Sequence, residues 1–345
     1  MRESLPDMNR KILQLLQYIL FLGIGVFLVW WQLKSMQPTE KEDFIRSLKN
    51  VDYRMVIPVV IMSLLSHLSR AMRWKILLEP LHYFPKLKNV FAVTMIGYLA
   101  NAAVPRLGEL MKCTFLARYE KLKVDKLFGS IILERTFDFV CFLLFIGITV
   151  LIQLDTVGAY FNDKISAIAG GNASFSWLNA LLFLLTAAAL LLFIRLILLR
   201  FPGNRFVQKV KGFIKGIIQG FAAIAQLKQQ KAFVAHTLFI WAMYLLQVYV
   251  GFNAMQSTSH LGMPAACSVL TLATLAMIAT PGGIGSFPIF VMQTLAIYLI
   301  PETQGKAFGW LLWGVNTGIV IVSGVLAIIL LPYINKKNNR IITTE

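Results

Sequence analysis

The sequence predicts an all-α polytopic membrane protein. Hydrophobic residues make up 57% of the 345 residues and charged residues only 14%, whereas about a quarter of a soluble domain is charged. The apolar residues are grouped in about eight blocks, most of them near the ~20 residues that a helix needs to cross a bilayer. Lysine and arginine are also unevenly distributed between the blocks, which is typical of chains with a fixed membrane orientation.

The apolar blocks follow one another along nearly the whole chain. They run at roughly 13–33, 55–69, 89–111, 127–153, 177–199, 232–254, 263–300 and 309–332. Arg2, Arg10 and Lys11 precede the first block. That block is too long for the core of a cleavable signal, and no small-residue cleavage site follows it, so we interpret it as a retained first span.

Two blocks are interrupted where an ordinary span would be continuous. Val104-Pro105 lies inside the third block, and Thr280-Pro281-Gly282 lies inside the seventh. Proline removes a backbone donor, and glycine leaves the backbone free to bend. Such breaks persist at membrane depth only where protein or a water-filled cavity satisfies the freed backbone groups.

Loop charges indicate how the interrupted blocks lie in the bilayer. If both enter and leave on the same side, Lys and Arg favour the cytoplasmic segments by more than three to one, whereas eight simple spans give at best three to two. The positive-inside rule therefore favours six full spans, two broken re-entrant hairpins and cytoplasmic N- and C-termini. The segment 34–54 fits poorly, because it carries five basic residues on the outer side.

The order of the segments predicts an inverted repeat within a single integral membrane domain, residues 1–345. The first half, about 11–154, starts inside, and the second half, about 177–333, starts outside. A cytoplasmic amphipathic linker is predicted at about 203–231. Inverted repeats with paired broken helices are typical of transporters whose site lies near the bilayer midplane.

Charged side chains in or beside the apolar blocks identify a candidate binding site, because each is costly in a bilayer unless it is paired or hydrated. Arg70 and Arg73 share a helix face at the end of the second block, with Trp74 expected at interface depth. They suit either phosphate binding or ordinary cytoplasmic anchoring. The break in the third block adds Asn101, Pro105, Arg106, Gly108 and Glu109.

The fourth block carries a charged cluster of its own. Glu134 and Asp138 lie four residues apart on one helix face, and Arg135 can reach Asp138. One carboxylate is expected to be protonated or cation-bound, since like charges repel at low dielectric. The cluster is either functional or a buried network that locks helices together.

The break in the seventh block contributes no charge. Its exposed backbone amides and half-helix end are suited to anions or oriented dipoles. The residues that form it are Pro281, Gly282, Gly283 and Gly285.

Several other classes of site are not predicted. The four histidines lack metal-ligand spacing, so we expect no metal site and no cofactor. The net charge of +17 is explained by the positive-inside rule and by attraction to anionic headgroups. Without an aromatic-basic motif, nucleic acid is not expected as a partner. Without a nucleotide-binding loop, ATP is not expected to drive the protein directly.

These clusters, in this order and spacing, resemble the flippase-like membrane family related to the transmembrane region of lysylphosphatidylglycerol synthase, also called the multiple peptide resistance factor. The resemblance extends from about Lys11 to Tyr333. Its hallmarks here are Arg70-x-x-Arg73-Trp74, Asn101-x-x-x-Pro105-Arg106-x-Gly108-Glu109, Glu134-Arg135-x-x-Asp138 and Pro281-Gly282-Gly283-x-Gly285. The resemblance implies an eight-segment fold with broken helices. It also implies transfer of a lipid headgroup between leaflets, aminoacylated phosphatidylglycerol in the best-known relatives.

Three departures limit what the resemblance implies. Lys112 stands where the family often has arginine, and Phe287-Pro288 follows the glycine-rich break where many relatives place an acidic residue. The chain also ends at Glu345 without a soluble aminoacyl-transferase domain. We therefore expect that it is not an enzyme that synthesises an aminoacyl lipid.

The sequence favours a lipid flippase or transporter of the cytoplasmic membrane. The arginines at 70, 73 and 106 would attract phosphate, while the carboxylates at 109, 134 and 138 would handle a counter-cation or proton. Expected partners are anionic or zwitterionic membrane lipids, aminoacylated and polyprenyl-linked lipids among them, and a homo-oligomer is compatible with the sequence. Two alternatives stay open. One is a membrane-embedded enzyme with Glu134 and Asp138 as acid–base or metal-binding carboxylates; the other is an accessory subunit of a lipid-modifying synthase.

Overall fold

The computed structural model is helical in every element of the residues that it describes. It describes residues 25–32, 34–153 and 222–339, with single positions at 23, 200, 208, 212 and 216. Two compact units divide the chain: Met1–Ile132 with Lys228–Glu345, and Leu133–Leu227. The predicted fifth block and most of the predicted amphipathic linker lie outside the described residues.

Among the residues that the structure describes, four helices are long and apolar enough to cross a membrane. They are α3 (Val56–Leu78), α6 (Val124–Ile152), α10 (Gln230–Phe252) and α13 (Glu302–Asn339). They coincide with the predicted second, fourth, sixth and eighth blocks. The second block was predicted too short, because α3 continues for two more turns past position 69 before the 3-10 turn η2 (Glu79–Leu81).

The interrupted third block forms two helices that fold back on each other, here called hairpin 1. These are α4 (Leu87–Ala103) and α5 (Leu107–Glu120). The Glu120 carboxylate at the end of α5 accepts a hydrogen bond from the Lys86 backbone N–H at the start of α4, at 2.9 Å. The base of hairpin 1 is therefore closed, and its second arm extends well past the predicted limit at position 111.

The interrupted seventh block forms hairpin 2 in the same way. Its arms are α11 (Met263–Ala279) and α12 (Ser286–Ala296), joined through the 3-10 turn η3 (Pro281–Gly283). The Ser268 hydroxyl near the start of α11 lies 3.1 Å from the Tyr298 hydroxyl just beyond α12. Both predicted breaks are thus tips of helical hairpins.

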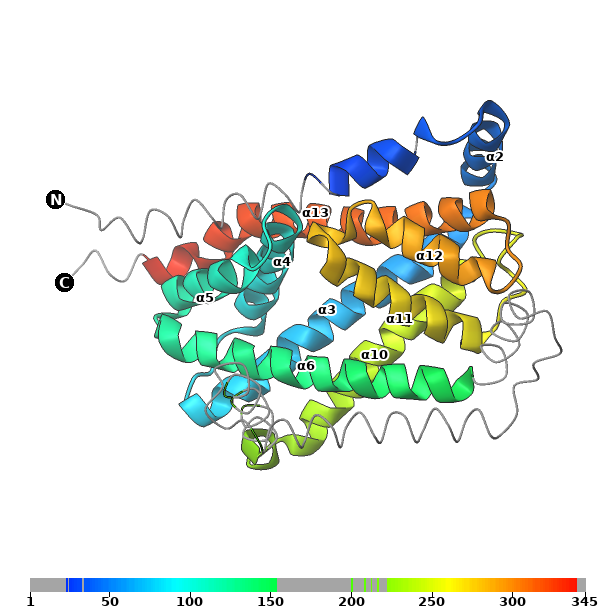
Figure 1. Cartoon of the computed structure of the whole chain (residues 1–345). Coiled ribbons are helices and arrows are strands. Elements are labelled where there is room, and N and C mark those ends of the chain that lie inside the picture. The colour runs from blue at the N-terminus through cyan, green and yellow to red at the C-terminus, as the bar shows by residue number, and fades with distance from the viewer. Residues whose placement is uncertain are drawn as a thin grey trace. The chain divides into compact units, whose positions relative to one another are not determined.

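The two hairpins open toward opposite ends of the helical unit (Figure 1). At one end, called end A, the base of hairpin 1 lies against the C-terminal part of α13, because Asn89 and Asn335 exchange amide hydrogen bonds of 3.0 and 2.9 Å. At the other end, called end B, α10 finishes beside the start of α3, where Asp52 N–H donates to Ala254 O at 2.9 Å. A short connection leads from there to the start of hairpin 2.

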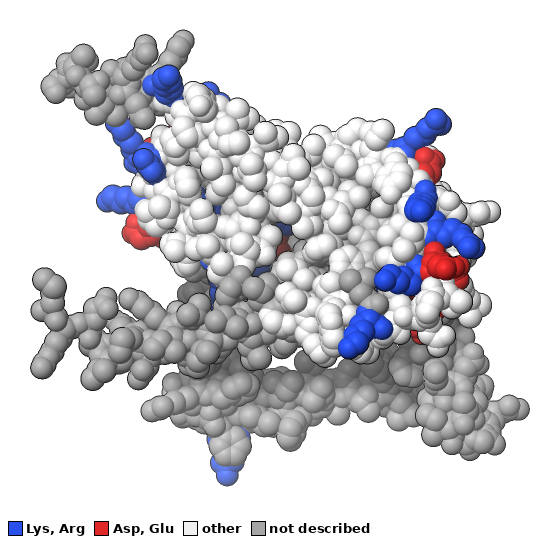
Figure 2. All heavy atoms as spheres, turned by 90° about the horizontal axis from the view of Figure 1, so that it is seen from above, with Lys and Arg blue, Asp and Glu red and all other residues white. Residues whose placement is uncertain are grey.

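The distribution of charged side chains fits an arrangement in which the helices cross a membrane. Figure 2 shows lysines, arginines and carboxylates gathered at opposite ends of the viewed face, with mostly uncharged surface between them. Exposed aliphatic side chains of the unit include Ile61 on α3 and Val322 on α13. An uncharged band between two charged rims is the pattern of a membrane-embedded surface.

The segment that fitted the charge rule poorly forms a separate helix, α2 (Pro38–Lys49). It has no buried residue, and it packs against α13. Its basic side chains are accompanied by Glu40, Glu42 and Asp43, and Asp43 lies 3.7 Å from Arg46. The five basic residues thus lie on or beside an exposed polar helix, and not on a membrane span.

Candidate functional site

The tips of the two hairpins share one backbone conformation. Val104 and Thr280 are both extended, with φ/ψ of −137°/117° and −134°/153°. A proline follows each, and the next residue is left-handed: Arg106 at φ 67° and Gly282 at φ 61°. In each turn the N–H three residues on closes a hydrogen bond to the extended residue's carbonyl, at 3.2 and 3.0 Å. A proline followed by a positive φ is the pattern of a type II turn.

The two tips meet. A Cβ built on Gly282 would lie 3.6 Å from Ala102 Cα, one turn before the break in hairpin 1. The indole N–H of Trp313 on α13 donates to the Gly282 carbonyl at 2.9 Å. The two hairpins begin at opposite ends of the unit, and their tips therefore meet between those ends.

Hairpin 1 is held together by the polar residues of its own break. The Asn101 carboxamide accepts from the Gly108 N–H at 2.8 Å and donates to Glu109 Oε1 at 3.3 Å. Gly108 has to be glycine, because a Cβ there would lie 2.0 Å from the Gly97 carbonyl. The predicted residues Asn101, Gly108 and Glu109 therefore do come together.

Arg106 differs from the rest of this group. Its side chain is exposed at the tip. A left-handed arginine costs about 1 kcal/mol relative to glycine. Such strain at a tip is more typical of a functional position than of a structural one.

The tip of hairpin 2 is held together by hydrogen bonds between uncharged polar groups. The hydroxyls of Thr280 and Ser286 lie 2.7 Å apart across the break. The Gln32 carboxamide donates to the Gly285 carbonyl at 2.8 Å. Gly283 and Gly285 are both left-handed, at φ 70° and 73°, and Pro281 is buried.

The arginines of α3 are buried against α10 instead of anchoring the end of a span. Arg73 is fully buried, and its Nη1 donates to Thr237 Oγ1 at 3.1 Å. Arg70 is 7% exposed, and its Nη2 donates to the Tyr244 hydroxyl at 3.1 Å. The Trp74 side chain is completely buried within the protein, and the interface depth expected for it stays a prediction.

Trp74 links α3 to hairpin 1 and to the start of α6. Lys112 on α5 places its ammonium 3.9 Å from the centre of the Trp74 ring, and the indole N–H donates to Ser130 Oγ at 2.9 Å. Lys112 is itself buried. Three cationic side chains are therefore buried near Trp74. Arg70 and Arg73 lie within about one helical turn of it on α3 and contact α10, whereas Lys112 contacts its ring from α5.

Sequence reasoning did not assign Lys112, Thr237 or Tyr244 to the site. Lys112 falls after the apolar block, and Thr237 and Tyr244 are ordinary polar residues within a span. The nearest available signal was the position of Lys112, three residues after Glu109 and so on a neighbouring helix face.

The charged cluster of α6 belongs to the second compact unit. Glu134 is 2% exposed, Asp138 is half-buried and Arg135 is exposed. The expectation that one of the two carboxylates, Glu134 or Asp138, is protonated or cation-bound stays a prediction.

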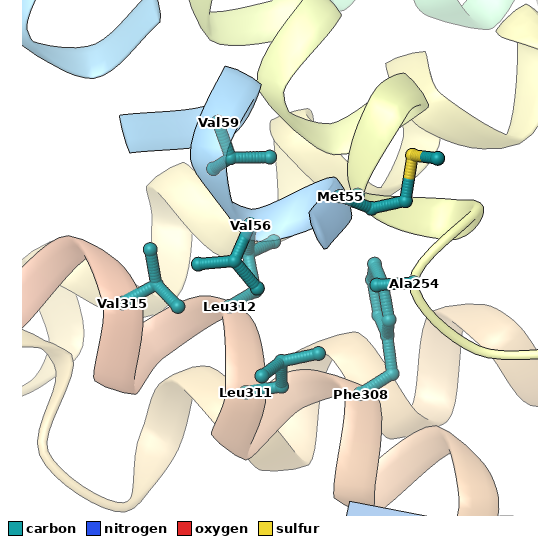
Figure 3. Close-up of a pocket in the computed structure, with 9 residues that line it drawn as sticks. Met55, Val56, Val59, Ala254, Phe308, Leu311, Leu312 and Val315 are labelled. Carbon is teal, nitrogen blue, oxygen red and sulfur yellow. The ribbon is translucent and has the colours of Figure 1, made fainter. Parts of the chain in front are cut away.

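A crevice at end B has different chemistry. It is lined without a single polar side chain by the start of α3, the end of α10 and the facing part of α13 (Figure 3). Its labelled lining residues are Met55, Val56, Val59, Ala254, Phe308, Leu311, Leu312 and Val315. A crevice of this kind offers no group to hold a charged headgroup. In the described part of the chain, no cluster of His, Cys, Asp or Glu could hold a metal ion.

Comparison with known proteins gives two matches. The family model described as the lysylphosphatidylglycerol synthase TM region matches residues 18–324. A UPF0104 membrane protein of Methanocaldococcus jannaschii is 27% identical over 107 residues, which is 30% of this chain and 32% of that protein. The chain therefore aligns with about a third of that relative's length. No solved structure matches.

Proposed function

The chain belongs to the family of the lysylphosphatidylglycerol synthase TM region, and from this membership we propose that it moves a phospholipid or lipid-linked headgroup between the leaflets of the cytoplasmic membrane. The observation that carries the proposal is the meeting of two hairpin tips from opposite ends, in a unit that also buries three cationic side chains. Transporters with paired broken helices bind their substrates at such a junction.

The cations define the part of the lipid that is recognised. Arg70, Arg73 and Lys112 are three buried cationic side chains, and a charge-assisted hydrogen bond from a buried group to an anion is stronger than one at a surface. Arginine's planar fork suits phosphate, which every phospholipid headgroup carries. Arg106, exposed at the tip, supplies a fourth positive charge on the hairpin that carries Lys112.

The hairpins would provide the path. Hairpin 1 opens to end A and hairpin 2 to end B, so a headgroup can leave one rim beside the first and reach the other rim beside the second. The acyl chains remain in the bilayer, against the uncharged surface seen in Figure 2. End A is assigned to the cytoplasm, because the base of hairpin 1 and the end of α3 carry the larger number of lysines and arginines.

Reconstitution tests the proposal. The purified protein is placed in liposomes that contain a headgroup-labelled phosphatidylglycerol, and arrival of the label in the other leaflet is followed with a membrane-impermeant quencher. We expect transfer above the rate of protein-free vesicles, with a chemically unchanged lipid. No excess transfer, or a changed headgroup, would overturn the proposal, and the second result would instead support the enzyme alternative.

Two exposed arginines of hairpin 1 give a matched pair of variants. Arg106→Gln alters the tip and Arg118→Gln alters the base, and neither side chain is buried. A charge-assisted hydrogen bond contributes about 1.5–3 kcal/mol, so Arg106→Gln is expected to slow transfer by about tenfold or more. Arg118→Gln should stay within about twofold, because a surface charge contributes little. Equal rates for both variants would remove Arg106 from the path.

A further inference from the structure

The tip of hairpin 2 contains more hydrogen-bond acceptors than hydrogens to satisfy them. Thr280 Oγ1 lies 3.0 Å from the Ile284 carbonyl and 2.7 Å from Ser286 Oγ, which lies 2.8 Å from the Ala276 carbonyl. Each hydroxyl has a single hydrogen. Three oxygen–oxygen contacts therefore share two hydrogens, and both hydroxyl side chains are buried, at 4% and 3% exposure.

A further buried oxygen belongs to Gln32, whose carboxamide contacts the same tip. Gln32 is 2% exposed, and its Nε2 donates to the carbonyls of Leu28 and Gly285, at 3.2 and 2.8 Å. Because both neighbours are carbonyls, the nitrogen must face them and the amide orientation is determined. Its Oε1 has no hydrogen-bond partner among the described residues. Gly285 directly precedes Ser286, so this unsatisfied acceptor belongs to the same tip.

The space at this tip suits an ion better than a headgroup. A Cβ built on Gly285 would lie 2.7 Å from both the Gly25 carbonyl and Leu28 Cβ. The segment of residues 25–32 is therefore in backbone contact with hairpin 2. A buried, donor-poor group of oxygens is stabilised by a bound cation, and broken helices of transporters coordinate Na⁺ or H⁺ through such groups.

We propose that the tip of hairpin 2 binds a single Na⁺ ion through Thr280 Oγ1, Ser286 Oγ and Gln32 Oε1, completed by backbone carbonyls of the break. All of these ligands are neutral. Mg²⁺ and Ca²⁺ are usually held by carboxylates, and the residues that the structure describes contain no carboxylate cluster that could hold a metal. A neutral oxygen set therefore favours a monovalent ion.

The site gives the proposed lipid transfer a source of energy, and in this respect the inference rests on the proposed function. Na⁺ at the tip joins hairpin 2 to the segment of residues 25–32. Its loss leaves three oxygen–oxygen contacts with two hydrogens, and Gln32 Oε1 without a partner among the described residues. The contact between that segment and the hairpin is then stronger with the ion bound. A Na⁺ gradient can in this way bias the position of one hairpin tip relative to the other.

Binding is tested without any lipid transport. The full chain in detergent is unfolded thermally while NaCl replaces choline chloride at constant ionic strength, and binding of ²²Na⁺ to the same protein is measured directly. We expect a saturable rise in the unfolding midpoint with Na⁺ that K⁺ reproduces only weakly. No saturable ²²Na⁺ binding, or equal midpoints in all three salts, would overturn the site.

Variants place the ion at the tip. Thr280→Val removes the hydroxyl in the same shape, and Thr280→Ser keeps it. The first is expected to raise the half-saturating Na⁺ concentration about tenfold or more, and the second to leave it within about threefold. Unchanged affinity in Thr280→Val contradicts the assignment. If that variant does not fold, Gln32→Met serves instead, with the same expected loss and the same contradicting result.

The test separates the two proposals. Lipid transfer that proceeds at the same rate with and without a Na⁺ gradient, in a protein that binds Na⁺ at Thr280, overturns coupling and leaves the proposed function intact. Specific Na⁺ binding in a protein without transfer activity overturns the proposed function and leaves the ion site intact.

Discussion

The two hairpins are alike in backbone and different in chemistry. Each turns through an extended residue, a proline and a left-handed residue. The left-handed position is arginine in hairpin 1 and glycine in hairpin 2, and Lys112 and Glu109 follow in hairpin 1 where hairpin 2 has only hydroxyls and amides. The comparison indicates that the shared turn sets where the helices break, while the side chains beside it determine what each break binds.

The largest effect is expected where hairpin 1 closes on itself. Gly108→Val places a branched side chain against the Gly97 carbonyl, which is backbone and cannot rotate away. A Cβ 2.0 Å from a backbone oxygen is far closer than the ordinary overpacking that costs about 1–3 kcal/mol, so little folded, monodisperse protein is expected in size-exclusion chromatography. Gly129→Ala on α6 is the control, since nothing lies within 4 Å of a Cβ there. Normal yield of Gly108→Val would show that the arms of hairpin 1 are not in backbone contact.

The contact between hairpin 1 and α3 is expected to depend on Trp74. Trp74→Leu removes the ring under the Lys112 ammonium and leaves a cavity, so the free energy of unfolding should fall by about 3–5 kcal/mol. Trp74→Phe keeps a ring and loses only the indole hydrogen bond to Ser130, at a cost of about 1–2 kcal/mol. Chemical denaturation in detergent measures both. Equal losses for the two variants would argue against the cation–π contact.

Exchanging the tip residues tests the comparison itself. Arg106→Gly makes the first turn resemble the second, and relief of the left-handed strain should stabilise the protein by about 1 kcal/mol. The same variant should transfer lipid more slowly, because the tip loses its positive charge. Gly282→Ala should destabilise by about 1 kcal/mol at its positive φ. Thermal unfolding and the liposome assay follow the two properties separately. An Arg106→Gly protein that is less stable than the parent would contradict the strain argument.

A smaller effect is expected where a hydrogen bond joins the tip of hairpin 2 to α13. Trp313→Phe removes the indole donor to the Gly282 carbonyl and should cost about 0.5–1.5 kcal/mol. Trp310→Phe on the same helix is the matched control, because its indole N–H has no hydrogen-bond partner among the described residues. The control should be neutral or slightly stabilising. A loss for Trp310→Phe that exceeds the loss for Trp313→Phe would show that the hydrogen bond to the tip contributes little.

The helical class and the two hairpins were predictable from local signals. Proline at 105 and 281 marks both breaks, and loop lysines and arginines indicate that each broken block turns back. The positions at which the helices end were harder to predict. Hydropathy ends the second block before Arg70 and the third before Lys112, because it scores a buried charge as if it were exposed. For that reason α3 and α5 proved longer than expected.

The composition of the candidate site was only partly predictable. Asn101, Gly108 and Glu109 come from one break and are close in sequence, so their contacts could be anticipated. The stacking of Lys112 on Trp74 joins different helices, and no spacing rule within one helix can indicate it. The meeting of Gly282 with Ala102 depends likewise on the packing of the two hairpins, which neither turn specifies alone.

The central claim is that the two broken segments enter from opposite sides and turn back. Single cysteines placed at Lys86, Lys121, Met263 and Leu299, all exposed, test it in a protein whose three native cysteines are replaced by alanine. Labelling with a membrane-impermeant thiol reagent in vesicles of known orientation should mark Lys86→Cys and Lys121→Cys from the cytoplasmic side. Met263→Cys and Leu299→Cys should be labelled only from the outer side. If the two cysteine positions at the base of one hairpin were labelled from opposite sides of the membrane, that hairpin would not turn back, and the central claim would be wrong.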